Sequence, residues 1–540
     1  MRKLILQPDY TAFRSYYQIK LPFELELMIP ADDPVRLLSA FVEGMDLTEL
    51  YKTYDRVRKN QASPHQMLRI MNYAAMNGLF SSRDIEVACR RDINFMYLLE
   101  GMPVPDHATI ARFISLHLST CSKNILSEVS SALFSLGEIS GKTVFIDGTK
   151  IEANANKYTF VWKKSVTKNQ ARLFEKIITF VAECEAMYGL KIVYQDQISL
   201  RTLKRLRKKL YSIKQSEGII FVKGIGRRKT SLQKSVETIE YYIEKLKEYT
   251  KKLYICGDRN SYSKTDPDAT FMRLKEDAML NGQLKPAYNL QHAVDAQYIT
   301  WLDISPRPTD VTTLVPLLKD MEKHLPFKYT EIVADAGYES EEAYVFLESN
   351  GQESYIKPQN YEISKTRKYR QDISRRENMA YIPEDDCYIC SNGKRLIAVN
   401  ERRKKNRNGY VSTETIYECE DCHGCPYKEK CIHGNHCKTP MEDRNKRLNV
   451  SKTMKAKREE TLKRITTEYG TQLRMNRSIQ AEGSFAVLKE DMGFRQYLYR
   501  GKENVLAQSV LVAVAHNINK LHFKIQGNRT GTFLTNLKRA

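Results

Sequence analysis

The sequence lacks two kinds of apolar segment, a membrane-spanning run and a secretory leader. Its longest apolar stretch, VLAQSVLVAVA at 505–515, is shorter than the roughly 20 residues that a spanning helix needs. The N-terminus, MRKLILQPDYTAF, starts with charge but has no apolar core of signal-peptide length. We therefore expect a cytoplasmic protein with no membrane partner.

Acidic residues are scarce relative to basic ones. The chain has 86 Lys and Arg against 65 Asp and Glu, which gives a formal net charge of +21. Because a Lys or Arg that binds a phosphate releases a condensed counterion, this excess favours a polyanionic partner. The alternative is a basic protein whose charge serves only its solubility.

Cysteine is rare outside one segment. Seven of the eleven cysteines lie between 387 and 437, and such clustering in a cytoplasmic chain favours metal binding over disulfides. Paired C-x2-C spacings are typical of a structural zinc ribbon, in which four thiolates hold one Zn²⁺. We expect Cys387 and Cys390 to bind the ion together with two of the four later cysteines. Because His423, His433 and His436 lie nearby, the set of four ligands stays open. The alternative is that these thiols are reduced and bind no metal. The candidates are Cys387, Cys390, Cys419, Cys422, Cys425 and Cys431.

The chain divides into four segments by pattern. Residues 1–135 are mostly helical and suit a helix-turn-helix-like DNA-binding domain, or equally any small helical domain. Residues 140–345 carry strands and are interrupted by a helical insertion at about 160–280, for which heptad-like spacing predicts an antiparallel helical hairpin. Residues 346–445 are basic and cysteine-rich, and residues 446–540 are helical again.

The 140–345 segment has the element order of a ribonuclease-H-like core. Residues 141–147 form a first strand, at whose end Gly148 lets the chain turn, and two strands follow within AYNLQHAVDAQYITWLDISP. A helix capped by Thr309 or Asp310 comes next, and then a strand that ends at Asp335. The chain is thus expected to be an α/β protein with a mixed sheet, a helical N-terminal domain, a helical-hairpin insertion and a zinc-ribbon-like insertion.

Three carboxylates are placed to converge in such a core. Asp147 and Asp335 end apolar strands, and Glu482 lies on a later amphipathic helix. Like charges so close need cations, and Mg²⁺ or Mn²⁺ takes oxygen ligands while keeping positions open for phosphate. Two such ions can activate a nucleophile and stabilise a leaving oxygen. Asp295, Asp303 and Asp310 compete for the second position, and Asp310 is interpreted mainly as a helix cap.

Several motifs resemble the DDE transposases of bacterial insertion sequences. They are FIDGTKIEANANKYTFVWKK, TDPDA, IVADAGYES and NRSIQAEGSFAVLKEDMGFRQYLYRG. By this resemblance Asp147, Asp335 and Glu482 would be the catalytic triad. Around the glutamate such transposases often show Y-x2-R-x3-E-x6-K; Lys489 fits, whereas Ser478 and Met475 stand at the Arg and Tyr positions. The residues expected to bind DNA are Arg477, Lys489, Arg474 and Lys150.

The resemblance implies a DNA transposase. Such an enzyme cleaves phosphodiester bonds at the ends of an insertion sequence and joins the freed 3′-ends to target DNA. Its partners would be the terminal inverted repeats, target DNA and a second copy of the chain, and it would associate with the bacterial nucleoid. Two alternatives remain, a transposase-derived DNA-binding regulator without catalysis and a plain metal-dependent nuclease.

Overall fold

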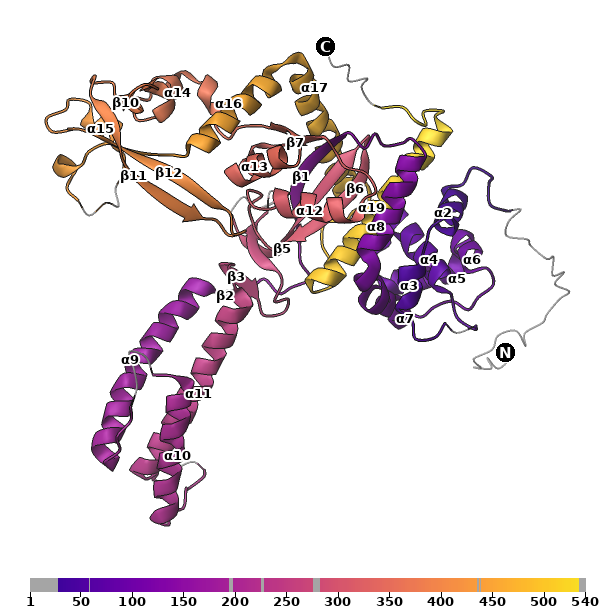
Figure 1. Ribbon diagram of the computed structural model, residues 1–540. Coiled ribbons are helices and arrows are strands. Elements are labelled where there is room, and N and C mark those ends of the chain that lie inside the picture. Colours follow the sequence, from indigo (N-terminus) through magenta and orange to yellow (C-terminus); the bar gives the residue numbers. More distant parts are fainter. Residues whose placement is uncertain are drawn as a thin grey trace, which may run out of the picture.

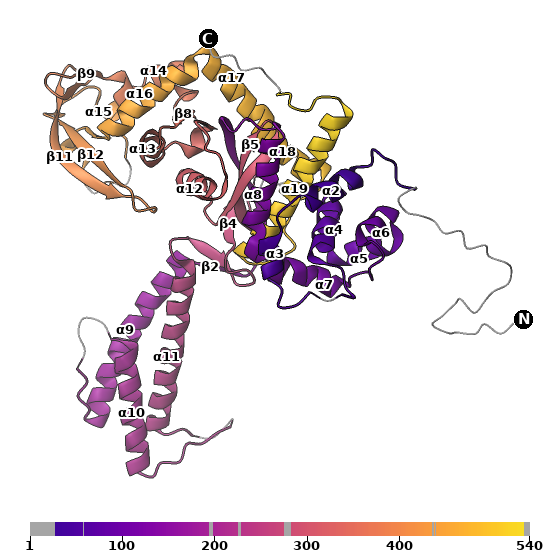
Figure 2. The same cartoon turned by 45° about the vertical axis from the view of Figure 1, so that its right-hand side comes forward.

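The protein is described from a computed structural model that covers residues 28–533, apart from 58, 194–197, 225–227, 275–281, 435–436 and 438. A central body holds the main sheet, with a helical lobe on one side and a cysteine-rich domain on the other (Figure 1). A long helical arm projects from the body, as a second view also shows (Figure 2). No helix in the described ranges is long and apolar enough to cross a membrane.

The main sheet has the strand order β4-β5-β1-β7-β8, with β6 paired to β5. β1 lies centrally, antiparallel to β5 and parallel to β7. This mixed sheet is consistent with a ribonuclease-H-like domain, in which the first and fourth core strands are neighbours. The strands are β1 (Thr143–Glu152), β4 (Thr270–Arg273), β5 (Leu284–Asp295), β6 (Tyr298–Ser305), β7 (Glu331–Ala334) and β8 (Glu353–Ile356).

β1 is longer than the sequence predicted. The expected strand ended at Asp147 with a turn at Gly148, but β1 continues in extended conformation to Glu152. The reason is tertiary pairing, because β5 lies alongside every residue from Phe145 to Glu152. Asp147 therefore stands in the middle of a strand, directly opposite His292.

Helices pack around the sheet, and the last of them runs through the core. α19 (Lys502–Gln526) is buried on all sides from Val505 to Ile518, as expected of a helix without a polar face. It contacts β6 and the helical lobe, whereas α12 (Leu314–His324) contacts β6 and α13 (Glu341–Ser349) contacts β8. α12 starts later than predicted: its N-cap is Thr313, not Thr309 or Asp310, and no side chain caps it.

The N-terminal lobe is helical throughout its described part. α4 begins with a capping box, in which Ser63 and Gln66 satisfy each other's backbone amides, and it packs on α19. The helices are α2 (Pro34–Glu43), α3 (Thr48–Lys52), α4 (Pro64–Met76), α5 (Ser82–Arg91), α6 (Ile93–Leu99), α7 (His107–Arg112), the π-helical η2 (Phe113–Leu118) and α8 (Ser119–Ser135).

The arm contains three helices rather than the predicted two-helix hairpin. They are α9 (Lys163–Tyr188), α10 (Leu200–Ser216) and α11 (Ser231–Cys256). The basic run at 199–214 forms α10, whose Leu203, Leu206 and Leu210 are buried in a core that belongs to the arm alone. A two-stranded ribbon of β2 (Phe160–Trp162) and β3 (Ser261–Ser263) joins the arm to the body.

The cysteine-rich domain is built on a five-stranded sheet of order β13-β12-β11-β10-β9. Its long hairpin reaches back to the body. The strands are β9 (Ala380–Ile382), β10 (Cys387–Ile389), β11 (Arg395–Lys405), β12 (Val411–Cys419) and β13 (Arg447–Val450). Short helical turns accompany them: η4 (Ile363–Lys365), α14 (Arg367–Arg370), η5 (Arg376–Asn378), α15 (Lys428–Cys431) and η6 (Met441–Asp443).

After this domain the chain returns to the sheet as α16 (Lys452–Thr466) and then a continuous helical stretch. That stretch comprises α17 (Glu468–Arg477), η7 (Ser478–Glu482), α18 (Gly483–Ala486) and η8 (Val487–Asp491). α17 contacts β1, β7 and β8, and η7 contacts β1 and β5. The helix that carries Glu482 therefore packs beside the strands that carry the two aspartates.

Candidate active site

Asp147 lies on β1 and Asp335 directly follows the neighbouring strand β7, at the centre of the main sheet. β1 and β7 run parallel, and the residue before Asp147 pairs with the residue before Asp335. Each carboxylate accepts a local backbone N–H: Asp147 Oδ1 from Gly148 at 2.8 Å and Asp335 Oδ1 from Gly337 at 2.8 Å. The two side chains thus start from adjacent positions at the end of β7.

Glu482 is connected to Asp147 through an arginine. Arg477 Nη1 lies 3.2 Å from Asp147 Oδ2, and Arg477 Nη2 donates to Glu482 Oε1 at 2.8 Å. Glu482 is the last residue of the π-helical turn η7, and such turns are frequent at functional sites. A guanidinium group therefore stands between the first and third acidic residues of the predicted triad.

The electrostatics of Asp147 reflect this crowding. Burial raises the pKa of Asp147 to about 6, while the Arg477 guanidinium and the Gly148 amide act to lower it. The negative charges of Asp335 and Glu482 raise it further. The three carboxylates are thus close enough to interact, and an added cation would favour the ionised form of Asp147.

A fourth carboxylate, Asp310, stands beside the same residues. Its Oδ1 accepts from Asn289 Nδ2 at 2.6 Å and from Gln291 Nε2 at 3.0 Å. A Cβ atom added to Gly148 would lie 3.1 Å from Asp310 Oδ1, and one added to Gly337 would lie 3.5 Å from Asp310 Oδ2. The interpretation of Asp310 as a helix cap is therefore wrong, because its carboxylate binds β5 side chains.

Sequence reasoning missed the polar network under Asp310. Gln291 Oε1 accepts from Thr313 Oγ1 at 3.1 Å and from the Tyr338 hydroxyl. Gln291 and Asn289 are two of the buried polar residues of β5, which also carries His292 and Asp295. That polarity was the available signal, because a buried amide needs hydrogen-bond partners.

The other two competing aspartates lie elsewhere. Asp295 accepts from the backbone amides of Ser140 and Gly141 at 2.8 and 2.9 Å, which fixes the start of β1. Asp303 lies on β6, where the charges of Lys502 and Lys123 act on it. Neither side chain makes a described contact with Asp147 or Asp335.

Two protein-family models match the chain. A model described as a transposase DDE domain matches residues 389–522, a range that includes Glu482. A model described as a transposase domain (DUF772) matches residues 23–116, within the helical N-terminal segment. Both models describe transposase domains, and together they support a DDE transposase of an insertion sequence. Searches of curated proteins and of solved structures gave no match.

The basic residues predicted to bind DNA in this transposase do not form one group. Lys489 Nζ donates to Thr149 Oγ1 at 2.8 Å, two residues along β1 from Asp147. Lys150 Nζ donates to the Arg273 carbonyl at 3.2 Å, at the sheet edge formed by β4. Arg474 lies over the Tyr361 ring, 5.1 Å from its centroid. Arg477 and Lys489 are therefore near the acidic site, whereas Lys150 and Arg474 have other neighbours.

The transposase family generally uses divalent metal ions, and the donors around Asp147 fit such ions by chemistry. Carboxylate oxygens are the ligands that Mg²⁺ and Mn²⁺ prefer. Within the described ranges, however, no three His, Cys, Asp or Glu side chains stand close enough together to coordinate one ion. Arg477 contacts one oxygen each of Asp147 and Glu482, so the guanidinium competes with a metal ion for these two oxygens.

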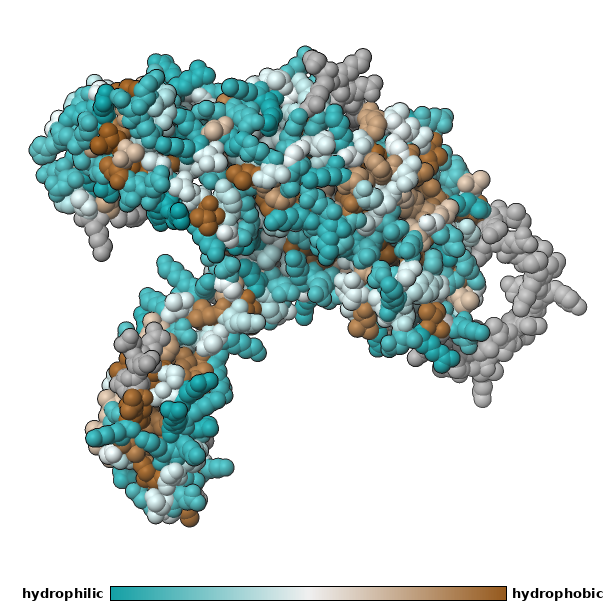
Figure 3. Space-filling view, in the orientation of Figure 1, coloured by the Kyte–Doolittle hydropathy of each residue, from teal (hydrophilic) through white to brown (hydrophobic). Residues whose placement is uncertain are grey.

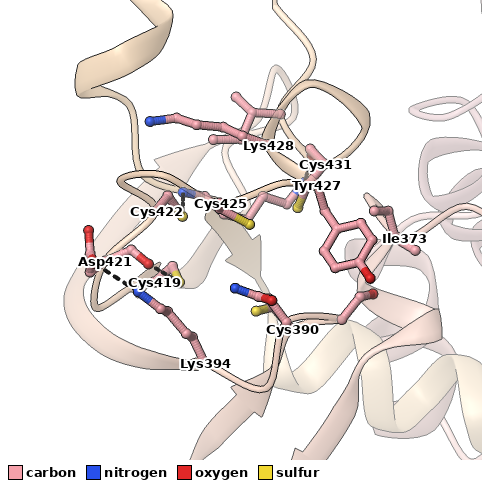
Figure 4. Close-up of a pocket in the computed structure, with 14 residues that line it drawn as sticks. Ile373, Cys390, Lys394, Cys419, Asp421, Cys422, Cys425, Tyr427, Lys428 and Cys431 are labelled. Atoms are coloured by element: carbon pink, nitrogen blue, oxygen red, sulfur yellow. Dashed lines mark hydrogen bonds and ion pairs between the residues drawn. The ribbon is translucent and has the colours of Figure 1, made fainter.

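Five of the six candidate thiols of the transposase line one small cavity. The cavity measures about 20 Å³, and Figure 4 shows the cysteine sulfurs arranged around it. Cys387 is buried on β10 and is not among the lining residues, so the pair expected to bind together is split. His433 is exposed, and His436 lies outside the described residues. The lining cysteines are Cys390, Cys419, Cys422, Cys425 and Cys431.

Proposed function

We propose that this protein is an active transposase that cleaves phosphodiester bonds at insertion-sequence ends and joins the ends to target DNA. The observation that carries the proposal is the grouping of Asp147, Asp335 and Glu482, which are distant in sequence but interact electrostatically around Arg477. A structural scaffold has no need for three interacting carboxylates around the two central strands of its sheet, because like charges repel.

The residues would divide the work by position. Asp147, Asp335 and Glu482 would hold two Mg²⁺ or Mn²⁺ ions, which supply Lewis-acid activation of the nucleophile and stabilise the leaving oxygen. Arg477 and Lys489 would bind phosphate oxygens beside them. Asp310, held by Asn289 and Gln291, would keep the region next to Gly148 polar and fixed.

Labelled DNA that carries the inverted repeats flanking the coding region tests the proposal. With Mg²⁺ we expect cleaved ends and joined products from the wild type, and neither from Asp147→Asn, Asp335→Asn or Glu482→Gln. Glu384→Gln, an exposed carboxylate of the cysteine-rich domain, is the matched control and should retain activity. Cleavage without joining would indicate a plain nuclease, and binding unaffected by Asp147→Asn without cleavage would indicate a regulator.

We further propose that the active complex contains two copies of the chain, because two DNA ends must be held together for joining. The arm is a candidate contact, since Tyr241 and Met187 on its helices are exposed apolar residues, at 54% and 61%. Light scattering with and without end DNA gives the subunit number. A complex with a single chain per DNA end pair would contradict the proposal.

We propose that the cysteine cavity binds one structural Zn²⁺ through Cys390, Cys422, Cys425 and Cys431, whose thiols must draw closer together than they stand in the structure to coordinate one ion. A space of about 20 Å³ suits a single ion, and the backbone N–H of Lys446 donates to Cys422 Sγ at 3.3 Å, which orients that sulfur. Cys419 instead donates its S–H to the Asp421 carbonyl at 3.6 Å. We expect about one zinc per chain by elemental analysis, lost in Cys422→Ser and retained in Cys387→Ser.

A further inference from the structure

A basic cleft lies where the arm, the main sheet and the cysteine-rich domain meet. Its walls are the base of the arm around Arg259, the β4 edge at Arg273, the loop at 306–312 and the tip of the β11–β12 hairpin at 405–407. The cleft has a volume of about 890 Å³. Figure 3 shows this face hollowed where the arm leaves the body, with mainly hydrophilic residues around the hollow.

The cleft concentrates positive charge. Six cationic side chains line it against a single carboxylate, Asp258. None of the six forms an ion pair with a carboxylate in the part of the chain that the structure describes, although ion pairs are common elsewhere on this protein. Unpaired like charges held together repel one another unless an anion joins them. The six are Lys150, Arg259, Arg273, Arg307, Lys405 and Arg407.

Hydrogen bonds fix the wall contributed by the hairpin tip. Asn408 Oδ1 accepts from Arg307 Nη1 at 2.9 Å, and Asn408 Nδ2 donates to Glu342 Oε2 at 3.0 Å. Tyr410 donates its hydroxyl to Glu341 Oε1 at 2.9 Å. The cleft is therefore a preformed feature, in which a domain far along the chain is tied to the loop before Asp310.

The cleft is connected to the acidic site through Asp310. Lys150 lies three residues after Asp147 on β1, so its side chain is on the opposite face of the sheet, the face of its pairing partner Asn289. The Arg307 carbonyl accepts from Asn289 Nδ2 at 3.2 Å, and the same amide donates to Asp310. A polyanion that occupies the cleft would thus reach Asp310, which lies beside Gly337 and so next to the Asp335 side of the acidic site.

We propose that this cleft binds the phosphate backbone of the duplex segment next to the scissile phosphate. The inference rests on the proposed function for the identity of the polyanion as DNA, and it adds where that DNA lies. Six cations over an open cleft of this size match successive phosphates of a strand rather than one small anion. Trp162, which also lines the cleft, offers an aromatic face to the sugars or bases.

Arg273→Gln, Lys405→Gln and Arg407→Gln together form the test variant, since none of these side chains makes a described hydrogen bond within the fold. Lys204→Gln, Arg205→Gln and Lys208→Gln on α10 form the control, with the same charge change on exposed residues of the arm. A third variant, Arg273→Lys, Lys405→Arg and Arg407→Lys, keeps the charge.

Binding of fluorescent end DNA is measured against salt concentration with Ca²⁺, so the readout does not depend on cleavage. Each lost phosphate contact lowers the salt slope by about 0.9, so we expect a decrease of about 2.7 and at least tenfold weaker binding for the cleft variant. The α10 control should stay within about twofold of the wild type, and the charge-preserving variant should bind like the wild type.

Equal losses in the cleft and α10 variants, or no loss in the cleft variant, would overturn the inference. A loss confined to end DNA would assign the cleft to the transposon end, and an equal loss on unrelated duplex would assign it to the backbone irrespective of sequence; both support binding there. Cleavage that depends on Asp147 while the cleft variant binds normally would refute the cleft and leave the proposed function intact. Normal melting temperatures exclude misfolding as the cause.

Discussion

At the residue scale, Arg477 decides the charge balance of the acidic site. Its guanidinium contacts Asp147 and Glu482 and has a side chain only 16% exposed. The same oxygens would bind a metal ion, so the arginine and the ion compete. The transposase motif has its arginine at the position that Ser478 occupies here, and Arg477 stands one residue before it. Arg477 still reaches the site because it is the last residue of α17, which contacts β1.

We predict that Arg477→Gln binds Mn²⁺ more tightly than the wild type when DNA is absent. Removal of the competing cation should strengthen binding about fivefold, which corresponds to about 1 kcal/mol, when measured at pH 8 where Asp147 is ionised. Electron paramagnetic resonance of free Mn²⁺ gives the affinity. Arg474→Gln is the control, because Arg474 lies over Tyr361. Weaker Mn²⁺ binding by Arg477→Gln would contradict the competition.

A second prediction concerns His516, which is buried in α19. Burial lowers its pKa to about 4, and nearby Lys520 lowers it too, while the Gln297 carbonyl that accepts from Nε2 acts in the opposite direction. His292, also buried, faces the same region. Because the unfolded state binds a proton near pH 6.5 and the folded state only near pH 4, this contribution to stability is lost as pH falls between these values.

The expected cost at pH 5, relative to pH 7, is about 2 kcal/mol for His516 alone. His516→Gln, whose amide can still donate to the Gln297 carbonyl, should reduce the acid-induced fall in melting temperature. His522→Gln, on the partly exposed side of the same helix, should leave that fall unchanged. The same pH dependence in wild type and His516→Gln would refute the assignment.

At the scale of elements, the close approach of β1, β5 and η3 (Ala336–Tyr338) depends on glycine at 148. A Cβ atom there would lie 2.5 Å from Gln291 Nε2 and 3.0 Å from the Tyr338 hydroxyl. Both side chains are buried, and the Tyr338 hydroxyl donates to Gln291 Oε1, so the two side chains cannot move aside separately. The glycine is needed for space rather than for a turn.

We predict that Gly148→Ala lowers stability by about 1–3 kcal/mol through overpacking. Gly483→Ala is the matched control: nothing lies within 4 Å of its added Cβ, and alanine in a helix should stabilise by about 0.5–1 kcal/mol. Thermal unfolding followed by circular dichroism compares the two. A neutral Gly148→Ala would mean that the Gln291 network is looser than its distances indicate.

At the scale of the whole molecule, the arm is a separate folding unit. Its core shares no residue with the main core, and the arm reaches the body through the β2–β3 ribbon and a small cluster at its base. We predict that a fragment of residues 163–256 is helical and melts cooperatively on its own. The body with these residues replaced by a short linker should keep its melting temperature within a few degrees. An unfolded fragment would contradict this independence.

The sequence predicted the order of the core strands because each is an apolar run that stops at a polar residue. Asp147 and Asp335 were singled out for the same reason, and Glu482 because it lies on an amphipathic helix; that these three form the catalytic site stays a prediction. Contacts between distant segments could not be predicted. Pairing with β5 extends β1 past Gly148. Asp310 looks like a helix cap from its local sequence, but its carboxylate accepts hydrogen bonds from Asn289 and Gln291 on β5. The apolar stripe of α10 was readable, since Leu203, Leu206 and Leu210 have helical spacing.

The burial of α19 has a consequence for synthesis of the chain on the ribosome. This helix, the last one that the structure describes, fills the space between β6, α4 and α8, and Glu482 precedes it by only a short stretch. Until it emerges, the apolar faces of these elements have no partner, and the main core cannot close. The site therefore cannot form before α19 has been synthesised. A product truncated before residue 502 would expose that surface and be removed by proteolysis rather than cut DNA.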